Sequence, residues 1–305
     1  MLHVVIALLP TVGVSLFFFG LPAMVLIAAT VISSCATEWV INRYLLRRPD
    51  TLGDGTAALS GLLLALTLPS QLPWWTAVIG AVIAIGVGKM AFGGLGCNIF
   101  NPALVGRVFL LLSFPALMTT WPAPGWGFCA EADGITTATW LSHAAQGITT
   151  ASVAVHTASP IDMLIGFRAG SMGEVGIIAI AIGCIYLIAK RIISYIIPAT
   201  IIATYAAIAY VMGYDVITEV MAGGLAFGAV FMATDYVTSP MTTKGMIVYG
   251  VIIGLLTLVI RHSGSYPEGI SFAILLGNGA TPLIDRYMRP ARFSNKAKKA
   301  ANHSH

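Results

Sequence analysis

The chain has 305 residues, of which 57% are hydrophobic and only 9% are charged. A soluble domain carries about 25% charged residues, so most of this surface cannot face water and a soluble globular class is excluded. The net charge of +4 comes largely from the basic tail between Arg286 and Lys299, so it indicates membrane topology rather than binding of nucleic acid.

Apolar runs recur along the first part of the chain, and each approaches the roughly 20 residues that a membrane-spanning helix needs. The first run occupies the place of a signal peptide, but no basic segment precedes it and a second run follows at once. The third run is short and rich in small residues, which is tolerated at membrane depth when a segment is buried or lines a cavity. We predict spans over residues 4–20, 21–42, 55–69, 73–91 and 97–119.

Residues 120–172 form the one long hydrophilic interruption of the chain, rich in Pro, Gly, Ser, Thr and Ala. Trp121, Trp126 and Trp140 suit a membrane interface. Within this interruption the segment 133–139 combines an acid, a glycine and three threonine hydroxyls. It is either an ordinary solvated connector or a place where a group is attached.

The second part of the chain repeats the pattern of the first. We predict spans over residues 173–190, 192–213, 217–233, 245–261 and 267–285, followed by a basic tail over 291–305. The eighth span of the series, like the third, is short and rich in glycine. Such segments favour a cavity between helices rather than contact with lipid.

Basic residues predict the orientation in the cytoplasmic membrane. Counting spans places most of them on one side, which the positive-inside rule makes cytoplasmic; Arg168 and Arg261 are the exceptions. Both termini are then cytoplasmic and the 120–172 loop is extracytoplasmic. The residues that decide this are Arg43, Arg47, Arg48, Lys89, Lys190, Arg191 and Lys244, together with those of the tail.

The predicted fold is therefore an all-α membrane protein with about ten transmembrane helices and an external loop. Because each half, 1–119 and 173–290, has an odd number of spans, a duplicated half has inverted topology. The halves share an Asn-x-x-x-Pro pattern, at 98–102 and at 278–282, and each has a broken span. Chance similarity among apolar segments is the alternative explanation of this repeat.

The cysteines and histidines do not indicate a metal centre. Cys35, Cys97, Cys129 and Cys184 have no Cys-x-x-Cys spacing, and the first, second and fourth fall in predicted spans. The six histidines are scattered without ligand spacing. We therefore expect no metal or iron–sulfur site held by this chain alone.

Intramembrane acids are costly in lipid, so each is by default a functional candidate. Asp54 precedes the third span, Glu219 begins the eighth and Asp235 follows it. These residues are the ion-pathway candidates. Capping of a helix start through the helix dipole is the alternative role for Asp54 and Glu219.

Two polar stretches adjoin the broken spans. Residues 234–245 contain Asp235, Thr238 and Ser239, and residues 93–102 contain Asn98 and Asn101. Hydroxyl and amide side chains offer both donors and acceptors, and glycines permit close backbone approach. We predict that both stretches line a cofactor or ion cavity.

Three stretches together resemble the RnfD family, the D subunits of Rnf ferredoxin:NAD oxidoreductase complexes. They are Phe92-Gly-Gly-Leu-Gly-Cys-Asn-Ile-Phe-Asn-Pro-Ala-Leu104, Ala233-Thr-Asp-Tyr-Val-Thr-Ser-Pro-Met-Thr-Thr-Lys-Gly245 and Gly61-Leu-Leu-Leu-Ala-Leu-Thr-Leu-Pro69. That family is related to NqrB, the corresponding component of the sodium-translocating NADH:quinone oxidoreductase. The resemblance covers nearly the whole chain, and the short tail and missing N-terminal extension favour the Rnf member. The start at Met1 is abrupt, because the family usually has a further polar stretch there.

The resemblance implies a covalent flavin on the external loop. In the family a flavin transferase joins FMN through its phosphate to a threonine in the pattern Asp-x-x-(Ser/Thr)-Gly-Ala-Thr. On this chain the pattern places the acceptor at Thr139, with Asp133, Thr136 and Ala138 matching. Thr137 stands where glycine is usual. A second, noncovalent flavin, riboflavin, near the broken spans is also implied.

The resemblance further implies an electron-transfer subunit that couples electron flow between ferredoxin and NAD to movement of Na⁺ or H⁺. Its partners are the other Rnf subunits, including a second FMN-bearing subunit and those that react with ferredoxin and NAD. No nucleotide fingerprint or ferredoxin-like cysteine set occurs here, so this chain is an enzyme only as part of a complex. The alternatives are an NqrB-like component of the quinone-reducing relative, or a channel or transporter with an inverted-repeat fold.

Overall fold

The structure is a computed structural model that describes residues 1–47, 51–121, 164–166, 170–263 and 269–288. Throughout these ranges the regular structure is helical, and no strand occurs in them. Several of the helices are long and apolar. The prediction of an all-helical chain of membrane type is confirmed to this extent. The number of spans and the inverted relation of the halves stay predictions.

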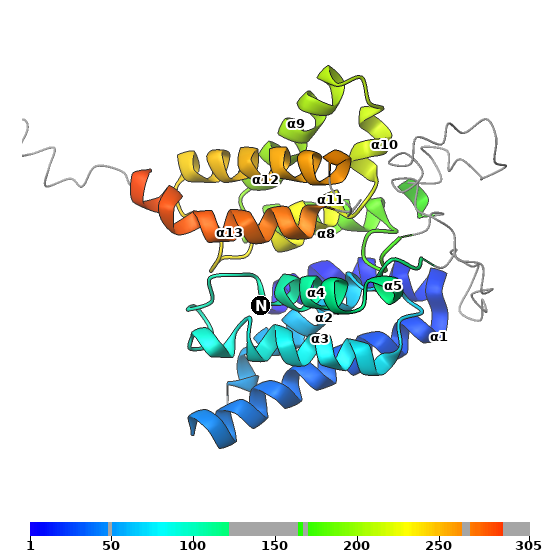
Figure 1. Cartoon of the computed structure of the whole chain (residues 1–305), viewed down its shortest axis with the longest axis vertical. Coiled ribbons are helices and arrows are strands. Elements are labelled where there is room, and N and C mark those ends of the chain that lie inside the picture. The colour runs from blue at the N-terminus through cyan, green and yellow to red at the C-terminus, as the bar shows by residue number, and fades with distance from the viewer. Residues whose placement is uncertain (48–50, 122–163, 167–169, 264–268, 289–305) are drawn as a thin grey trace, which may run out of the picture.

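The first half of the chain forms one group of helices, drawn in blue to green at the bottom of Figure 1. α1 doubles back at Gly20, whose φ of 60° and ψ of −140° interrupt the helix, and this is where the boundary between the first two spans was expected. Without that break its 39 residues would extend about 58 Å, far more than the roughly 30 Å of a bilayer core. The elements are α1 (Leu2–Val40), η1 (Ile41–Leu46), η2 (Leu52–Asp54), α2 (Thr56–Leu66), α3 (Trp74–Gly86), η3 (Met90–Phe92), α4 (Pro102–Ser113) and α5 (Pro115–Met118).

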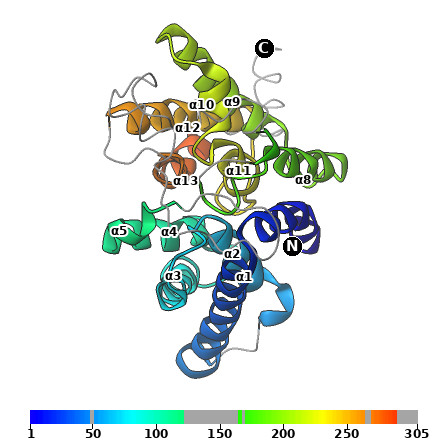
Figure 2. The same cartoon turned by 90° about the vertical axis from the view of Figure 1, so that its right-hand side faces the viewer.

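The second half forms the upper group in Figure 1, and Figure 2 shows the same two groups from the side. Here α12 packs against α9 and α13. The elements are α8 (Ile177–Ala189), α9 (Ile196–Val211), α10 (Val216–Met221), α11 (Leu225–Phe227), η4 (Gly228–Met232), α12 (Thr243–Ser263) and α13 (Ile270–Tyr287).

Two predicted spans differ from the helices observed. The fifth, 97–119, is not continuous: α4 begins only at Pro102, because Asn101 caps it by accepting a hydrogen bond from the backbone N–H of Ala103, and a proline fits the first turn of a helix. Its helix ends at Ser113, and Phe114 has non-helical angles before α5. Cys97 consequently lies in an exposed turn rather than within a span.

In the eighth predicted span, 217–233, residues 222–224 separate α10 from α11, and η4 follows α11 directly. The expectation of a broken segment here agrees with the helix limits. By length and composition, three described segments are able to cross a membrane, Leu2–Leu46, Trp74–Phe92 and Thr243–Ser263. Four further apolar helices are shorter: Thr56–Leu66, Pro102–Ser113, Ile177–Ala189 and Ile196–Val211.

The two groups meet where α8 crosses the N-terminal part of α1 and where α4 approaches α13. Gly183 of α8 makes the first crossing possible, because a Cβ there would lie 2.4 Å from the carbonyl oxygen of Ala7 and 2.8 Å from the ring of Phe231. The backbone also links the halves directly. Met172 and Gly173 donate hydrogen bonds to the carbonyls of Leu68 and Leu66 at the end of α2.

Candidate functional site

A cavity of about 80 Å³ lies between the two groups of helices. Its walls come from both halves: the start of α1, α2 and the approach to α4 on one side, and α8, η4 and the loop after η4 on the other. Its charged side chains are one base, Lys89, and one acid, Asp235. The polar residues of the lining are Thr56, Ser60, Asn98, Asn101, Thr234 and Tyr236.

Lys89 belongs to a buried polar network at the first-half wall, which we call the Lys89 cluster (Lys89, Glu38, Thr51, Thr56 and Asn42). Its ammonium lies 2.6 Å from Glu38 Oε2 and donates to the Thr56 hydroxyl, also at 2.6 Å. Thr51 donates to Glu38 Oε1 at 2.5 Å, and Asn42 donates to Thr51 at 2.8 Å. The two charged side chains are only 3% and 1% exposed, so each depends on the other to offset its desolvation.

Asp235 occupies the second-half wall, in the loop that follows η4. The Thr238 hydroxyl donates to its Oδ2 at 3.3 Å, and the backbone N–H of Ser239 donates to its carbonyl at 3.0 Å. Thr281 of α13 donates in turn to the carbonyl of Thr238. The loop is therefore folded around this carboxylate. Thr238 and Ser239 hold Asp235 and do not themselves line the cavity.

The predicted asparagines both lie at the cavity, on the approach to α4. Asn98 donates to the carbonyl of Phe100. Asn101 is 3% exposed; besides capping α4 it donates to the carbonyl of Met232 at 3.2 Å, which joins the two halves at the end of η4. With the oxygen of its amide turned towards Asn101, Asn278 of α13 accepts from the Asn101 backbone N–H at 3.1 Å.

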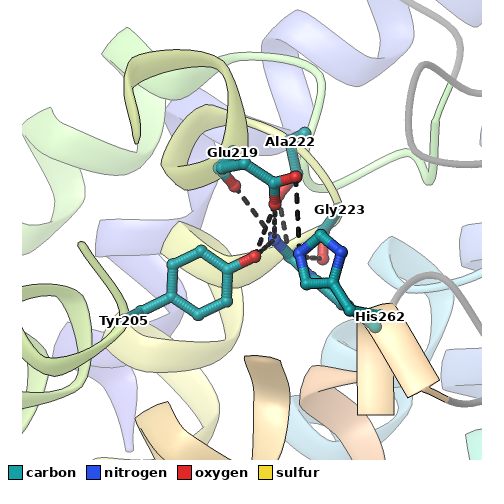
Figure 3. Close-up of polar contacts among 6 residues, drawn as sticks. Tyr205, Glu219, Ala222, Gly223 and His262 are labelled. Carbon is teal, nitrogen blue, oxygen red and sulfur yellow. Dashed lines mark hydrogen bonds and ion pairs between the residues drawn. The ribbon is translucent and has the colours of Figure 1, made fainter. Parts of the chain in front are cut away.

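Glu219 lies outside this cavity, in a second network that we call the Arg261 cluster (Arg261, Glu219, Tyr205, His262 and Tyr214). Figure 3 shows the contacts of Glu219 with Tyr205 and His262. Tyr205 donates to Glu219 Oε2 at 2.5 Å, and Arg261 Nη1 lies 3.5 Å from the same oxygen. Arg261 also donates to the carbonyls of Glu219, Ala222 and Gly223, where the broken helix is interrupted.

The remaining predicted site residues are not brought to either network. Asp54 is exposed at the end of η2, before the start of α2. Asp133, Thr136, Ala138 and Thr139 lie outside the described residues. In the described part of the chain no group of three or more His, Cys, Asp or Glu side chains is placed to hold a metal ion.

Sequence reasoning missed Glu38, Lys89 and Arg261 as interior charges. Glu38 lies inside the second predicted span, where its acidity alone marks it as costly. Lys89 served only as an indicator of topology and Arg261 only as an exception to it, although each ends an apolar run. The signal was present in each case. The sequence does not indicate which residue each buried charge pairs with, because the two members of a pair can be far apart along the chain. Glu38 and Lys89 are 51 residues apart.

The arrangement as a whole places one half-buried acid and one buried base on opposite walls of a cavity. The cavity is large enough for water or a small ion, since a water molecule needs about 10–15 Å³. The second, noncovalent flavin near the broken spans stays a prediction.

Comparison with known proteins places the whole chain among membrane redox subunits. The model of the NQR2, RnfD, RnfE family matches residues 1–294. The chain is 45% identical over 304 residues to the D subunit of the Na(+)-translocating ferredoxin:NAD(+) oxidoreductase complex of Acetobacterium woodii, covering 99% of this chain and 92% of that protein. It is 41% identical to the D subunit of the ion-translocating oxidoreductase complex of Stutzerimonas stutzeri (98% and 92% covered). It is 39% identical to the D subunit of the proton-translocating ferredoxin:NAD(+) oxidoreductase complex of Clostridium ljungdahlii (97% and 91% covered).

Proposed function

The chain belongs to the NQR2, RnfD, RnfE family, and we propose that it is the D subunit of an ion-translocating ferredoxin:NAD oxidoreductase complex. The observation that carries this function is the match to subunits of that name over nearly the full length of both chains. The chain is thus part of an oxidoreductase that acts only with its partner subunits. Those partners include a second FMN-bearing subunit, the subunits that react with ferredoxin and NAD, and a flavin transferase for maturation.

The two halves, 1–119 and 173–290, form an inverted repeat. Support comes from the broken helices: Gly55 before α2 and Gly224 before α11 both have φ 67° and ψ 8°. Lys89, near the end of α3, donates to Thr56 at the start of α2 in its own half. Arg261, near the end of α12, donates to the carbonyl of Gly223 just before α11 in its own half. The members of each pair, α3 with α12 and α4 with α13, run in opposite directions in Figure 1. Inverted repeats of this kind place ligand sites where broken helices meet.

The chain resides in the cytoplasmic membrane with both termini inside, the basic tail 291–305 among them, and the 120–172 loop outside. The distribution of arginine and lysine along the sequence supports this orientation. With the loop outside, the residues proposed for flavin attachment are separated from the cytoplasm by the helices. Electrons that reach them have to cross the membrane through partner subunits or this one.

FMN is joined to Thr139 through its phosphate. The support is the sequence pattern of Asp133, Thr136 and Ala138 before that threonine together with the family membership. When bound, FMN supplies transfer of one or two electrons. The chain contributes an accessible hydroxyl and, through the small side chain of Ala138, an open approach to it.

Ion movement passes through the cavity between the halves. Asp235 offers the negative charge that attracts a cation, and Lys89 limits how much positive charge the cavity tolerates. Asn98, Asn101 and Thr234 supply neutral oxygens around the same space. The geometry agrees with either Na⁺ or H⁺, because water and a small cation both fit in about 80 Å³.

The flavin assignment is tested by denaturing gel electrophoresis under ultraviolet light after co-expression with the flavin transferase. We expect a fluorescent band from the native chain, none from Thr139→Ala, and an undiminished band from the control Thr149→Ala, which lacks the upstream aspartate pattern. Mass spectrometry of the loop peptide should show one FMN adduct. Fluorescence that persists in Thr139→Ala would exclude Thr139 as the attachment site of FMN. A dark native band together with measurable solute flux favours a channel or transporter instead.

A further inference from the structure

The carboxylate of Glu219 is buried, with its two oxygens in different surroundings. Oε2 accepts the hydroxyl of Tyr205 at 2.5 Å and lies near Arg261. Oε1 faces Nε2 of His262 at 3.7 Å. In Figure 3, Tyr205 and His262 approach the carboxylate from different sides. One oxygen is thus committed to structure, and the other faces a group that can exchange a proton.

Arg261 has several hydrogen-bond acceptors besides the carboxylate of Glu219. Its guanidinium donates to the Tyr205 hydroxyl and to the three backbone carbonyls of Glu219, Ala222 and Gly223, at 2.9 to 3.0 Å. Those partners are neutral and keep their place whatever the charge of the carboxylate. Glu219 can therefore gain a proton while Arg261 continues to hold the interrupted helix.

The Lys89 cluster differs in this respect. Its ammonium has Glu38 at 2.6 Å as its anionic partner and a single hydroxyl, that of Thr56, as the other. Protonation of Glu38 would leave a buried ammonium without a countercharge, which costs several kcal/mol. Protonation of Glu219 also removes the anion nearest to Arg261, but that anion lies at 3.5 Å rather than 2.6 Å, and the guanidinium keeps four neutral hydrogen-bond acceptors.

His262 lies nearer the surface of the described structure than Glu219 does. Its side chain is 19% exposed, whereas that of Glu219 is 1% exposed. Its ring is stacked on Tyr214, with centroids 4.0 Å apart and planes 5° apart. Within the described part of the chain its Nε2 has no hydrogen-bond partner. An imidazole ring has one nitrogen that donates and one that accepts, so it is able to take up a proton at one nitrogen and release one from the other.

We propose that His262 and Glu219 form a proton-exchange site at the end of the helical bundle opposite the Lys89 cluster; this rests on the proposed function as an ion-translocating subunit. A proton from the medium binds neutral His262 and is passed from Nε2 to Glu219 Oε1. The products are a neutral imidazole and a neutral carboxylic acid, so no further reactant is needed.

The other charged or titratable groups around Glu219 are Tyr205 of α9, Arg261 of α12 and Tyr214 between α9 and α10. Asp215 caps α10 and is exposed, and Glu174 Oε2 lies 2.7 Å from where a Cβ of Gly224 would be. A proton is the ligand that fits. Two side chains of metal-ligating type are too few for a metal site, and no larger group occurs among the described residues.

The test is infrared difference spectroscopy of the assembled complex in lipid between acidic and alkaline pH. We expect a carboxylic acid C=O band that is absent in Glu219→Gln, an isosteric change, and moved in Glu219→Asp. After a pH jump, His262→Gln should slow the appearance of this band by about a hundredfold, the low end of what a positioned proton-transfer group contributes. Tyr214→Phe keeps the stacked ring and should leave the rate unchanged.

A band that persists in both Glu219 variants, or a His262→Gln rate equal to that of the native complex, overturns the proposal. So does a band that responds to Na⁺ at fixed pH and not to pH. The spectrum reports proton binding by the chain and needs neither flavin nor turnover. A native chain that gives no fluorescent gel band would therefore exclude the flavin assignment at Thr139 without affecting the infrared result.

Discussion

At the scale of single residues, Glu38 and Lys89 show how buried charges depend on each other. Each sits in an otherwise apolar run, and their charged atoms are 2.6 Å apart with almost no exposure. Removing one member of such a pair leaves the other charge buried and unpaired, whereas replacing both by apolar residues is often neutral or stabilising. Single and double substitutions at this pair are therefore expected to differ in stability.

We expect Glu38→Gln to lower the free energy of unfolding by about 3–5 kcal/mol, because the Lys89 ammonium loses its countercharge. The double variant Glu38→Leu with Lys89→Met should recover most of that loss. Asp54→Asn, at an exposed carboxylate of the same region, should stay within about 0.5 kcal/mol. Unfolding in mixed micelles with increasing SDS measures all three. A double variant as unstable as Glu38→Gln would contradict this account.

Asp235 supports a prediction about transport rather than stability. Asp235→Asn keeps the size of the side chain and its hydrogen bond to Thr238 but removes the negative charge from the cavity. We expect ion transport per electron in proteoliposomes of the complex to fall at least about tenfold, the effect of losing roughly 1.4 kcal/mol of attraction for the cation. The matched control is Asp215→Asn, an exposed helix cap at which asparagine serves equally well. Unchanged coupling in Asp235→Asn would exclude the carboxylate from the ion path.

At the scale of elements, the sequence pattern predicted that helices are interrupted but not at which residues the interruptions lie. Small-residue-rich spans at 55–69 and 217–233 indicated breaks. The second span is interrupted between α10 and α11, whereas the first holds the single short helix α2, which begins after Gly55. The two Asn-x-x-x-Pro patterns lie at different places in their helices, because Pro102 begins α4 whereas Pro282 lies inside α13. Gly55 and Gly224 share a left-handed conformation, which only the backbone geometry shows.

Alanine at these two glycines should give graded effects. The left-handed conformation costs an alanine about 1–2 kcal/mol, and at Gly55 this is the whole penalty because a Cβ meets nothing within 4 Å. At Gly224 a Cβ also lies 2.7 Å from Glu174 Oε2, so Gly224→Ala should be the more destabilising. Gly53→Ala, with open space and no positive φ, should be close to neutral. Unfolding midpoints in detergent rank the three, and a reversed order would contradict the geometry.

At the scale of the whole molecule, the two halves exchange hydrogen bonds at the ends of their broken helices. Gly173 of the second half donates to Leu66 at the end of α2, and Asn101 of the first half donates to Met232 at the end of η4. The cavity lies between these contacts. Movement of one half against the other therefore changes both broken helices and the cavity together.

The orientation of the molecule is tested with its own cysteines. Cys97 is exposed in the turn before α4, on the side that the basic residues predict to be cytoplasmic, and Cys129 belongs to the loop predicted outside. With the other cysteines replaced by serine, we expect a membrane-impermeant maleimide to label Cys97 in inside-out vesicles only. Cys129 should be labelled in intact cells. The opposite pattern would invert the proposed topology.

The sequence by itself determined the helical membrane class, the family and the candidate loop threonine, because apolar runs and contiguous motifs are local properties. It also identified Asn98, Asn101 and Asp235, which the structure brings to one cavity. Only the tertiary structure decided the partners of the buried charges: Glu38 for Lys89, and the carbonyls of a broken helix for Arg261. Those partners are set by the packing of helices far apart in the chain, and a linear pattern carries no information about which helix faces which.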